Sequence, residues 1–367
     1  MSAVPAALAR LGWTDARAAA FEPLAAAGRS PARVTVEHRG AYEVTAAAGP
    51  LRAVLAGRLR HLAASGELPV VGDWVAVDAR SADGGASIHA VLPRTTRVAR
   101  RAPGDHASPI QVLAANVDVV LVATSLNRDL SQRRLERYLA VAWESGARPV
   151  IVLTKADLAR DPVEIAIAEV AVGEVAAGVQ VMTVSARTGV GLDAVAALVR
   201  SGTVAVVGSS GVGKSTLINA LLGEERLATL EIREDDARGR HATTRRQLVA
   251  LPGGGALIDA PGLRELGLWG DDGGLASAFA DVEELAAGCR FSDCSHEREP
   301  GCAVAVAVSA GTLPAARLAG WLKLRREERH AALEQDPFAR REERRRWAII
   351  GRAGAARAAA RRGEWIP

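Results

Sequence analysis

The strongest constraint in this chain is the run from Val204 to Asn219, which reads VAVVGSSGVGKSTLIN. A short apolar segment enters a glycine-rich loop, and a helical pattern with Leu217, Ile218 and Leu222 follows. Glycines let backbone N–H groups converge on phosphate oxygens, and a helix N-terminus adds a partial positive charge. The run therefore predicts a strand, a phosphate loop and a helix that bind a nucleoside triphosphate. The predicted loop residues are Gly208, Ser209, Ser210, Gly211, Val212, Gly213, Lys214, Ser215 and Thr216.

Two residues of this loop have specific predicted roles. Lys214 is expected to reach the β- and γ-phosphates and so to act in catalysis. Ser215 is expected to hold Mg²⁺ through its hydroxyl. The cofactor that accompanies the nucleotide is therefore predicted to be Mg²⁺.

The identity of the base is predicted from two segments upstream. A predicted strand from Pro149 to Leu153 is followed by four candidate base-binding residues, Thr154, Lys155, Ala156 and Asp157. They resemble the NKxD segment of GTPases, in which the Asp accepts two hydrogen bonds from guanine; Thr154 replaces the usual Asn. A second strand, Val181 to Val184, leads into Ser185 and Ala186, similar to the SA segment that contacts guanine. Together these segments favour GTP over ATP.

The order of these segments is unusual. In GTPases of ordinary order the base-reading segments come after the phosphate loop, whereas here LTKAD precedes it. We therefore expect an α/β P-loop G domain whose parts are circularly permuted.

Candidate switch residues follow the loop. The segment GRHATT, 239–244, is expected to deliver Thr243 or Thr244 to Mg²⁺. The strand from Ala256 to Ile258 leads into DAPG, in which Asp259 would meet Mg²⁺ through water and Gly262 would meet the γ-phosphate.

The water-orienting residue is predicted by elimination. GTPases of the Ras type place a Gln directly after the DxxG glycine, but Leu263 stands there and cannot orient water. His241 is the nearest ring nitrogen that could align the attacking water, and the alternative is an ordinary solvated loop histidine.

Cys289, Cys294, His296 and Cys302 have the spacing C-x4-C-x-H-x5-C and include all three cysteines of the chain. Three thiolates and one imidazole can surround Zn²⁺ in a closed tetrahedron, which is typical of a structural site. The alternatives are a disulfide with one free thiol, or buried cysteines without a ligand.

The N-terminal part predicts a small β-barrel. Short β-branched runs are separated by Gly, Pro, Asp or Ser; they are Arg33 to His38, Ala41 to Ala46, Leu51 to Arg58, Trp74 to Asp78 and Ile88 to Leu92. A linker is expected from Arg100 to Pro109. Between 33 and 101 there are 10 Arg against 6 Asp and Glu, which favours contact with nucleic acid.

Taken in order, LTKAD, SA, GSSGVGKST, GRHATT, DAPG, RELGLW and CRFSDCSHEREPGCAV resemble the ribosome small-subunit-dependent GTPase family (RsgA, also called YjeQ). The likeness runs from about Arg33 to Trp347. It implies an N-terminal segment plus OB-fold RNA-binding barrel over 1–106, a circularly permuted G domain over 107–270 and a zinc-binding, basic helical domain over 271–367. It further implies a GTP hydrolase, stimulated by the ribosome, that acts late in maturation of the small ribosomal subunit and couples hydrolysis to its own release.

Composition agrees with this expectation. A chain of 367 residues can bury more than one core, and it has no run of 18 apolar residues, so we expect a cytoplasmic protein that does not enter a membrane. Residues 322–367 hold 13 Lys and Arg against 7 Asp and Glu. This excess suits rRNA phosphates, with a solvated helical face as the alternative. The expected partners are GTP or GDP and the small subunit with its rRNA, and the expected state is a monomer.

Two other functions stay open at this stage. One is a GTP-controlled RNA-binding switch outside the ribosome whose hydrolysis is incidental. The other is a P-loop ATPase or nucleotide kinase, which Asp157 disfavours because adenine presents an acceptor where guanine has a donor.

Overall fold

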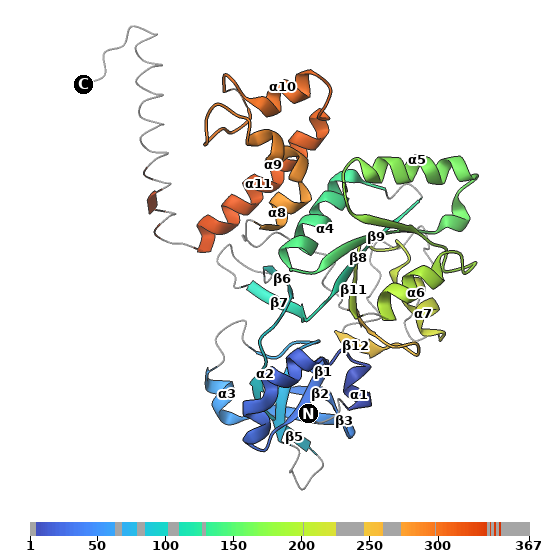
Figure 1. Ribbon diagram of the computed structural model, residues 1–367, viewed down its shortest axis with the longest axis vertical. Coiled ribbons are helices and arrows are strands. Elements are labelled where there is room, and N and C mark those ends of the chain that lie inside the picture. The colour runs from blue at the N-terminus through green and yellow to red at the C-terminus, as the bar shows by residue number, and fades with distance from the viewer. Residues whose placement is uncertain are drawn as a thin grey trace.

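A computed structural model describes residues 5–62, 68–78, 85–101, 110–126, 130–200, 202–224, 246–259, 273–297 and 299–335, together with residues 338, 341, 342 and 345. Figure 1 shows a barrel at the N-terminus, a central sheet with helices around it, and a group of C-terminal helices.

Five N-terminal strands close into a barrel. They are β1 (Ser30–His38), β2 (Ala41–Ala46), β3 (Gly49–Leu55), β4 (Trp74–Asp78) and β5 (Gly85–Val91). The pairing runs β1-β2-β3-β5-β4 and returns from β4 to β1, so the ring is closed and the predicted barrel is confirmed. The strand predicted to reach Arg58 ends at Leu55, because the Arg60 N–H bonds back to the Ala56 carbonyl and starts helix α3 (Gly57–Leu62).

Two helices precede the barrel, and neither was expected from the sequence. They are α1 (Ala6–Ala9) and α2 (Asp15–Ala26). Alanines lie on every side of α2, so its sequence has little amphipathic periodicity. Trp13 lies between the two helices and packs edge-on against Trp74 of the barrel, with ring centroids 4.8 Å apart.

The central sheet has the strand order β10-β9-β8-β11-β13-β12. Its strands are β8 (Val119–Ser125), β9 (Arg148–Thr154), β10 (Gln180–Thr183), β11 (Thr203–Val207), β12 (Gln247–Ala250) and β13 (Ala256–Asp259). All neighbours are parallel except β12 and β13, and every residue of β8 and β11 is buried, as expected when helices cover both faces. The four strands predicted here correspond to β9, β10, β11 and β13, with ends that differ by at most one residue.

Helices and short elements complete the central part. They are α4 (Gln132–Glu144), α5 (Pro162–Gly173), α6 (Leu192–Arg200), α7 (Lys214–Leu222), the 3-10 turn η1 (Ala156–Leu158) and a hairpin of β6 (Arg97–Arg101) with β7 (Ile110–Ala115). Arg100 and Arg101 therefore belong to a strand rather than to the predicted linker, and 102–109 lie outside the described residues.

The barrel and the central sheet are joined directly. Val36 of β1 pairs with Gln247 of β12, and the neighbouring Arg246 and Glu37 form an ion pair at 3.2 Å. The two units therefore form one continuous sheet of 11 strands.

A buried arginine reinforces this junction. The Arg33 side chain is 1% exposed, and its guanidinium donates to the carbonyls of Leu11, Gly72 and Asn116. It also donates to the Thr203 hydroxyl at 2.8 Å. Since Thr203 begins β11, one side chain connects the N-terminal segment, the barrel and the strand that leads into the glycine-rich loop.

The C-terminal helices are α8 (Gly273–Ala278), α9 (Ala280–Ala286), α10 (Ala303–Ser309) and α11 (Ala315–Gln335). Helices α8 and α11 pack against α4, and α9 packs against α8 and α10 (Figure 1). One hydrophobic cluster extends from Leu8 through Leu139 to Trp321, so the parts share a core in addition to the barrel's own. Among the residues that the structure describes, no helix combines the length and apolar character needed to span a bilayer.

The junction predicts a stability effect. Replacing Arg33 with Ala removes the donor to the buried Leu11 and Asn116 carbonyls and to the Thr203 hydroxyl. The Gly72 carbonyl keeps one donor, the Asn116 side-chain amide. We therefore expect the free energy of unfolding to fall by at least about 2 kcal/mol. Urea unfolding measures this. The control is Arg29→Ala, which breaks a partly exposed pair with Asp78 and should cost less than about 1 kcal/mol. If Arg33→Ala and Arg29→Ala lower the free energy of unfolding equally, Arg33 does not stabilise the junction between the barrel and the central sheet.

Candidate functional site

The glycine-rich loop lies at the carboxyl end of β11, where ligands bind in parallel sheets. Gly208 has φ +144°, and a Cβ there would lie 2.3 Å from the Ala123 carbonyl oxygen of β8. Only glycine therefore lets β11 turn into the loop so close to its neighbour. Val212 is buried under the loop, while Ser210 and Gly211 are exposed.

The Lys214 ammonium lies over this loop. It donates to the Gly208 carbonyl at 2.7 Å and also to the Ser209 carbonyl. Gly213, in the left-handed region at φ +95°, starts helix α7 with Lys214, Ser215 and Thr216 in its first turn. The described loop thus has the strand, cation and helix terminus of a phosphate site.

The predicted base-reading segment lies directly against the loop. The Thr154 hydroxyl is 2.5 Å from the Val212 carbonyl and 3.2 Å from the Thr124 carbonyl. Its single proton can be donated to either carbonyl, so the Thr154 side chain joins its own loop to the glycine-rich loop and to the end of β8. Lys155 has φ +59°, and its Cε lies 3.8 Å from where a Cβ on Gly213 would stand.

The second base-reading segment is bonded to the first. Asp157 is exposed in η1, and its carboxylate accepts a hydrogen bond from the Ser185 hydroxyl at 2.6 Å. The Ala156 N–H donates to the Val184 carbonyl at 3.1 Å, and half-buried Ala186 follows Ser185. These bonds bring the two predicted segments and the glycine-rich loop to one edge of the sheet.

The switch residues are only partly within the described structure. Asp259 ends β13, which runs parallel to β11, so Asp259 lies at the same edge of the sheet as Gly208. Gly262, Leu263, His241, Thr243 and Thr244 lie outside the described residues.

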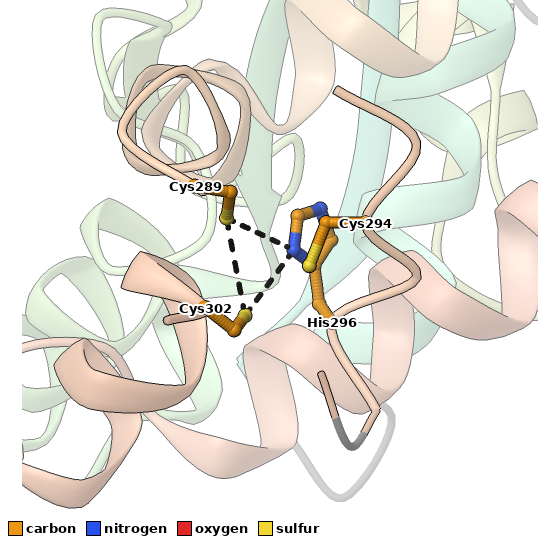
Figure 2. A group of neighbouring side chains, drawn as sticks. All are labelled: Cys289, Cys294, His296 and Cys302. Carbon is orange, nitrogen blue, oxygen red and sulfur yellow. Dashed lines mark hydrogen bonds between the residues drawn. The ribbon is translucent and has the colours of Figure 1, made fainter. Parts of the chain in front are cut away.

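The four predicted metal ligands converge at a second site (Figure 2). Their ligand atoms all lie within 4.8 Å of one another, and all but Cys289 are buried. The Cys289 and Cys302 sulfurs are 3.9 Å apart, and the His296 Nδ1 lies 3.5 Å and 3.4 Å from them. The cysteines are free thiols, so the disulfide alternative is not what the structure contains.

The distances among Cys289, His296 and Cys302 fit a tetrahedral ion, and the Cys294 sulfur completes the set within 4.8 Å of the others. With Zn–S near 2.3 Å and Zn–N near 2.0 Å, ligand atoms around zinc are separated by roughly 3.5–3.8 Å. His296 would bind through Nδ1, the atom that faces the sulfurs in Figure 2. Burial lowers the pKa of His296, with Arg325 acting in the same direction, and this favours the neutral imidazole that a metal requires.

Side chains from α11 and α9 lie beside the metal-ligand cluster. The Trp321 ring lies 5.2 Å from the His296 ring, and its indole N–H donates to the Glu283 carboxylate at 3.0 Å. No sequence motif marks Trp321 or Glu283 as neighbours of the site, because their approach depends on how helices distant in sequence pack.

One residue near the glycine-rich loop was also missed. The guanidinium of Arg134, in the first turn of α4, donates to the Ser209 hydroxyl. Arg134 is 75 positions from Ser209, and no sequence motif connects them.

The phosphate loop, the two base-reading segments before it and the sheet order define a circularly permuted P-loop GTPase. Residues 91–269 match the family model described as RsgA GTPase. The chain is 51% identical to "Small ribosomal subunit biogenesis GTPase RsgA" of Opitutus terrae over 94% of this chain and 95% of the relative. It is 48% identical to the protein of the same name from Streptomyces coelicolor over 97% and 96%. The chain therefore belongs to the RsgA GTPase family.

Solved structures agree with this assignment. The crystal structure of YjeQ from Thermotoga maritima is similar with a TM-score of 0.60 and 25% identity, covering 82% of this chain and 98% of that one. YloQ, described as a circularly permuted GTPase, is similar in fold with a TM-score of 0.59 and 22% identity, covering 82% and 95%.

The cluster of Cys289, Cys294, His296 and Cys302 leads to a prediction about bound zinc. Protein purified without added metal should contain about one zinc per chain, and chelation should unfold the C-terminal helices first, because forming the site and folding share one free energy. Elemental analysis measures the zinc, and hydrogen exchange of peptides from α9, α10 and α11 follows the unfolding around the site.

Cys294→Ser should lose the zinc, whereas Ser309→Ala, at the exposed end of α10, should keep it. Absence of zinc together with a Cys–Cys crosslink would contradict this assignment.

Proposed function

We propose that this chain is a GTPase that binds the small ribosomal subunit and couples GTP hydrolysis to late maturation of the subunit and to its own release. The observation that carries the proposal is the contact between Thr154 and Val212, which sets the base-reading segment against the phosphate loop. The relatives are named small ribosomal subunit biogenesis GTPases, and these names support the small subunit as the partner.

Nucleotide recognition is proposed to rest on Asp157 and the loop. The Asp157 carboxylate would accept two hydrogen bonds from guanine and would reject adenine, and the Ser185 hydroxyl at 2.6 Å orients it. The Lys155 stem would cover the ring, and the backbone of Ser185 and Ala186 would contact the base edge. The loop residues from Gly208 to Thr216 would surround the phosphates, with the Lys214 ammonium moving from loop carbonyls to phosphate oxygens.

Hydrolysis is proposed to use the switch residues. Ser215 and Thr243, with Asp259 through water, would hold Mg²⁺, which neutralises charge on the phosphate oxygens when it is bound. The Gly262 N–H would meet the γ-phosphate. Because Leu263 cannot orient water, His241 is the proposed residue that aligns it.

Contact with rRNA is proposed for both flanking parts. The barrel has an open hollow of about 440 Å³, lined by His38, Arg39, Ala41, Glu43, Pro50, Leu51 and Arg52. His38 pairs with Glu43 at 2.8 Å, so the charges available to a ligand are those of Arg39 and Arg52. Two arginines beside apolar side chains suit a phosphate backbone with an adjacent sugar or base. The excess of Arg and Lys over 322–367 suits phosphates in the same way.

The remaining features of the proposal concern the whole molecule. We infer a division into 1–106, 107–270 and 271–367, with a structural zinc in the third part. We further infer a monomer that acts in the cytoplasm, where ribosomal subunits mature, without contact with a membrane.

Guanine recognition predicts a change of specificity. Asp157→Asn should weaken GTP binding about 100-fold or more, because guanine donors lose their charged acceptor, and should admit xanthosine triphosphate. Equilibrium binding with both nucleotides measures this. Asp161→Asn is the matched control, since Asn still caps α5 and Asp161 contacts only that helix terminus among the described hydrogen bonds. Unchanged GTP affinity in Asp157→Asn would contradict the assignment.

The proposed partner predicts stimulated turnover. Phosphate release from GTP should rise at least about 100-fold when isolated small ribosomal subunits are added. Lys214→Ala should abolish both rates, because it removes the cation that acts on the phosphates. The proposal fails if the intact protein hydrolyses GTP equally with and without subunits; a GTP-dependent RNA-binding role outside the ribosome would then be favoured.

A further variant separates His241 from other sources of catalysis. His241→Ala should keep GTP affinity and subunit binding but lose about 10²- to 10⁴-fold of the stimulated rate, with little change in the unstimulated rate. Single-turnover kinetics on subunits measures this. Survival of the stimulated rate within a few-fold would show that the ribosome or backbone groups orient the water.

A further inference from the structure

The first turn of α4 contacts the glycine-rich loop. Arg134 donates to the Ser209 hydroxyl, and Lys214 donates to the Ser209 carbonyl. Two cations, one from α4 and one from α7, therefore meet at one residue of the loop. A triphosphate would draw the Lys214 ammonium away from this carbonyl and would attract the Arg134 guanidinium, so the bonds at Ser209 depend on the nucleotide.

The same turn of α4 holds a buried ion-pair network. The Glu136 carboxylate, two residues after Arg134, accepts from Arg317 of α11 at 3.1 Å, and both side chains are less than 5% exposed. Arg317 also pairs with Asp281 of α9 at 2.8 Å and lies 4.0 Å from the Phe279 ring centre. Since separating a buried pair is costly, α11 is expected to follow any displacement of this turn.

Two further contacts extend along α4. Arg137 pairs with Glu327 of α11 at 2.8 Å. Gly274 of α8 lies so close that a Cβ on it would stand 2.5 Å from the Ala140 carbonyl oxygen. Helix α4 is therefore held against α8 and α11 by backbone proximity as well as by charge, and it lies between the central sheet and the C-terminal helices in Figure 1.

We propose that Arg134 is a positioning residue that passes the state of the phosphate loop through α4 to the metal-bearing C-terminal helices. The inference rests on the GTP binding of the proposed function. Arg134 is exposed and can change its partner at low cost, whereas Glu136 and Arg317 are buried and keep theirs. If Arg134 interacts differently with the GTP and GDP states of the loop, the nucleotide shifts the position of α4. By thermodynamic linkage, the packing of the C-terminal helices on α4 then changes the relative affinity for GTP and GDP.

The test uses the full-length zinc-loaded protein with a non-hydrolysable GTP analogue, with GDP, or without nucleotide. Hydrogen exchange of peptides from α8 and α11 should differ between the analogue and GDP, each at saturation. In Arg134→Met this difference should disappear although the analogue still saturates the site, and the affinity ratio of analogue to GDP should fall about tenfold.

Matched variants separate this role from general effects. Arg133→Met removes the same charge from the neighbouring exposed position, which acts electrostatically on Glu136 but is not the residue that bonds Ser209. It therefore separates loss of charge near Glu136 from loss of the loop contact, and it should keep both the exchange difference and the affinity ratio within twofold. Ser209→Ala removes the partner of Arg134 from the loop side and should reproduce the loss in α11.

Two outcomes would overturn the inference. One is an exchange difference in α11 that persists in Arg134→Met, and the other is an intact protein that binds both nucleotides with no difference in α11. If the intact protein binds neither nucleotide, the proposed function itself fails, which is a separate result.

Discussion

The hydrogen bond between the Thr154 hydroxyl and the Val212 carbonyl is the contact on which the rest of the site depends. It joins two loops that are 58 positions apart, at the carboxyl ends of β9 and β11, which are separated in the sheet only by β8. Lys155 in its left-handed conformation and the Asp157–Ser185 bond extend the same contact to the base-reading side. Because these contacts depend on the order of strands in the sheet rather than on their order in the chain, a permuted sequence can build the same site.

The permuted order also decides what the site is attached to. The described chain enters the central sheet from the barrel, and Arg33 fixes that junction to the first residue of β11. The C-terminal helices instead pack on α4, through Glu136 and Arg317. The glycine-rich loop thus follows a strand anchored to the barrel, while Arg134 connects the loop to α4, against which the part with the Cys–His cluster packs. Each flanking part therefore has its own physical connection to the phosphate loop.

Much of this arrangement could be predicted from the sequence, since it follows local rules. The glycine-rich loop between Val207 and Lys214 fixes its own strand and helix, and the C-x4-C-x-H-x5-C spacing predicts a cluster that the structure brings together. Prediction failed where structure depends on distant packing. Helix α2 lacks an amphipathic pattern because alanines surround it, and Arg33, Arg134 and Arg317 look like ordinary charged residues until the fold buries or aligns them.

We propose that the two segments upstream of the phosphate loop make it specific for guanine. The direct measurement is displacement of a fluorescent GDP derivative from the intact protein in Mg²⁺ by unlabelled nucleotides. GTP and GDP should displace the probe, while ATP at about 100-fold excess should leave it bound, because adenine cannot satisfy Asp157. Displacement by ATP as effective as that by GTP would show that Asp157 does not select the base.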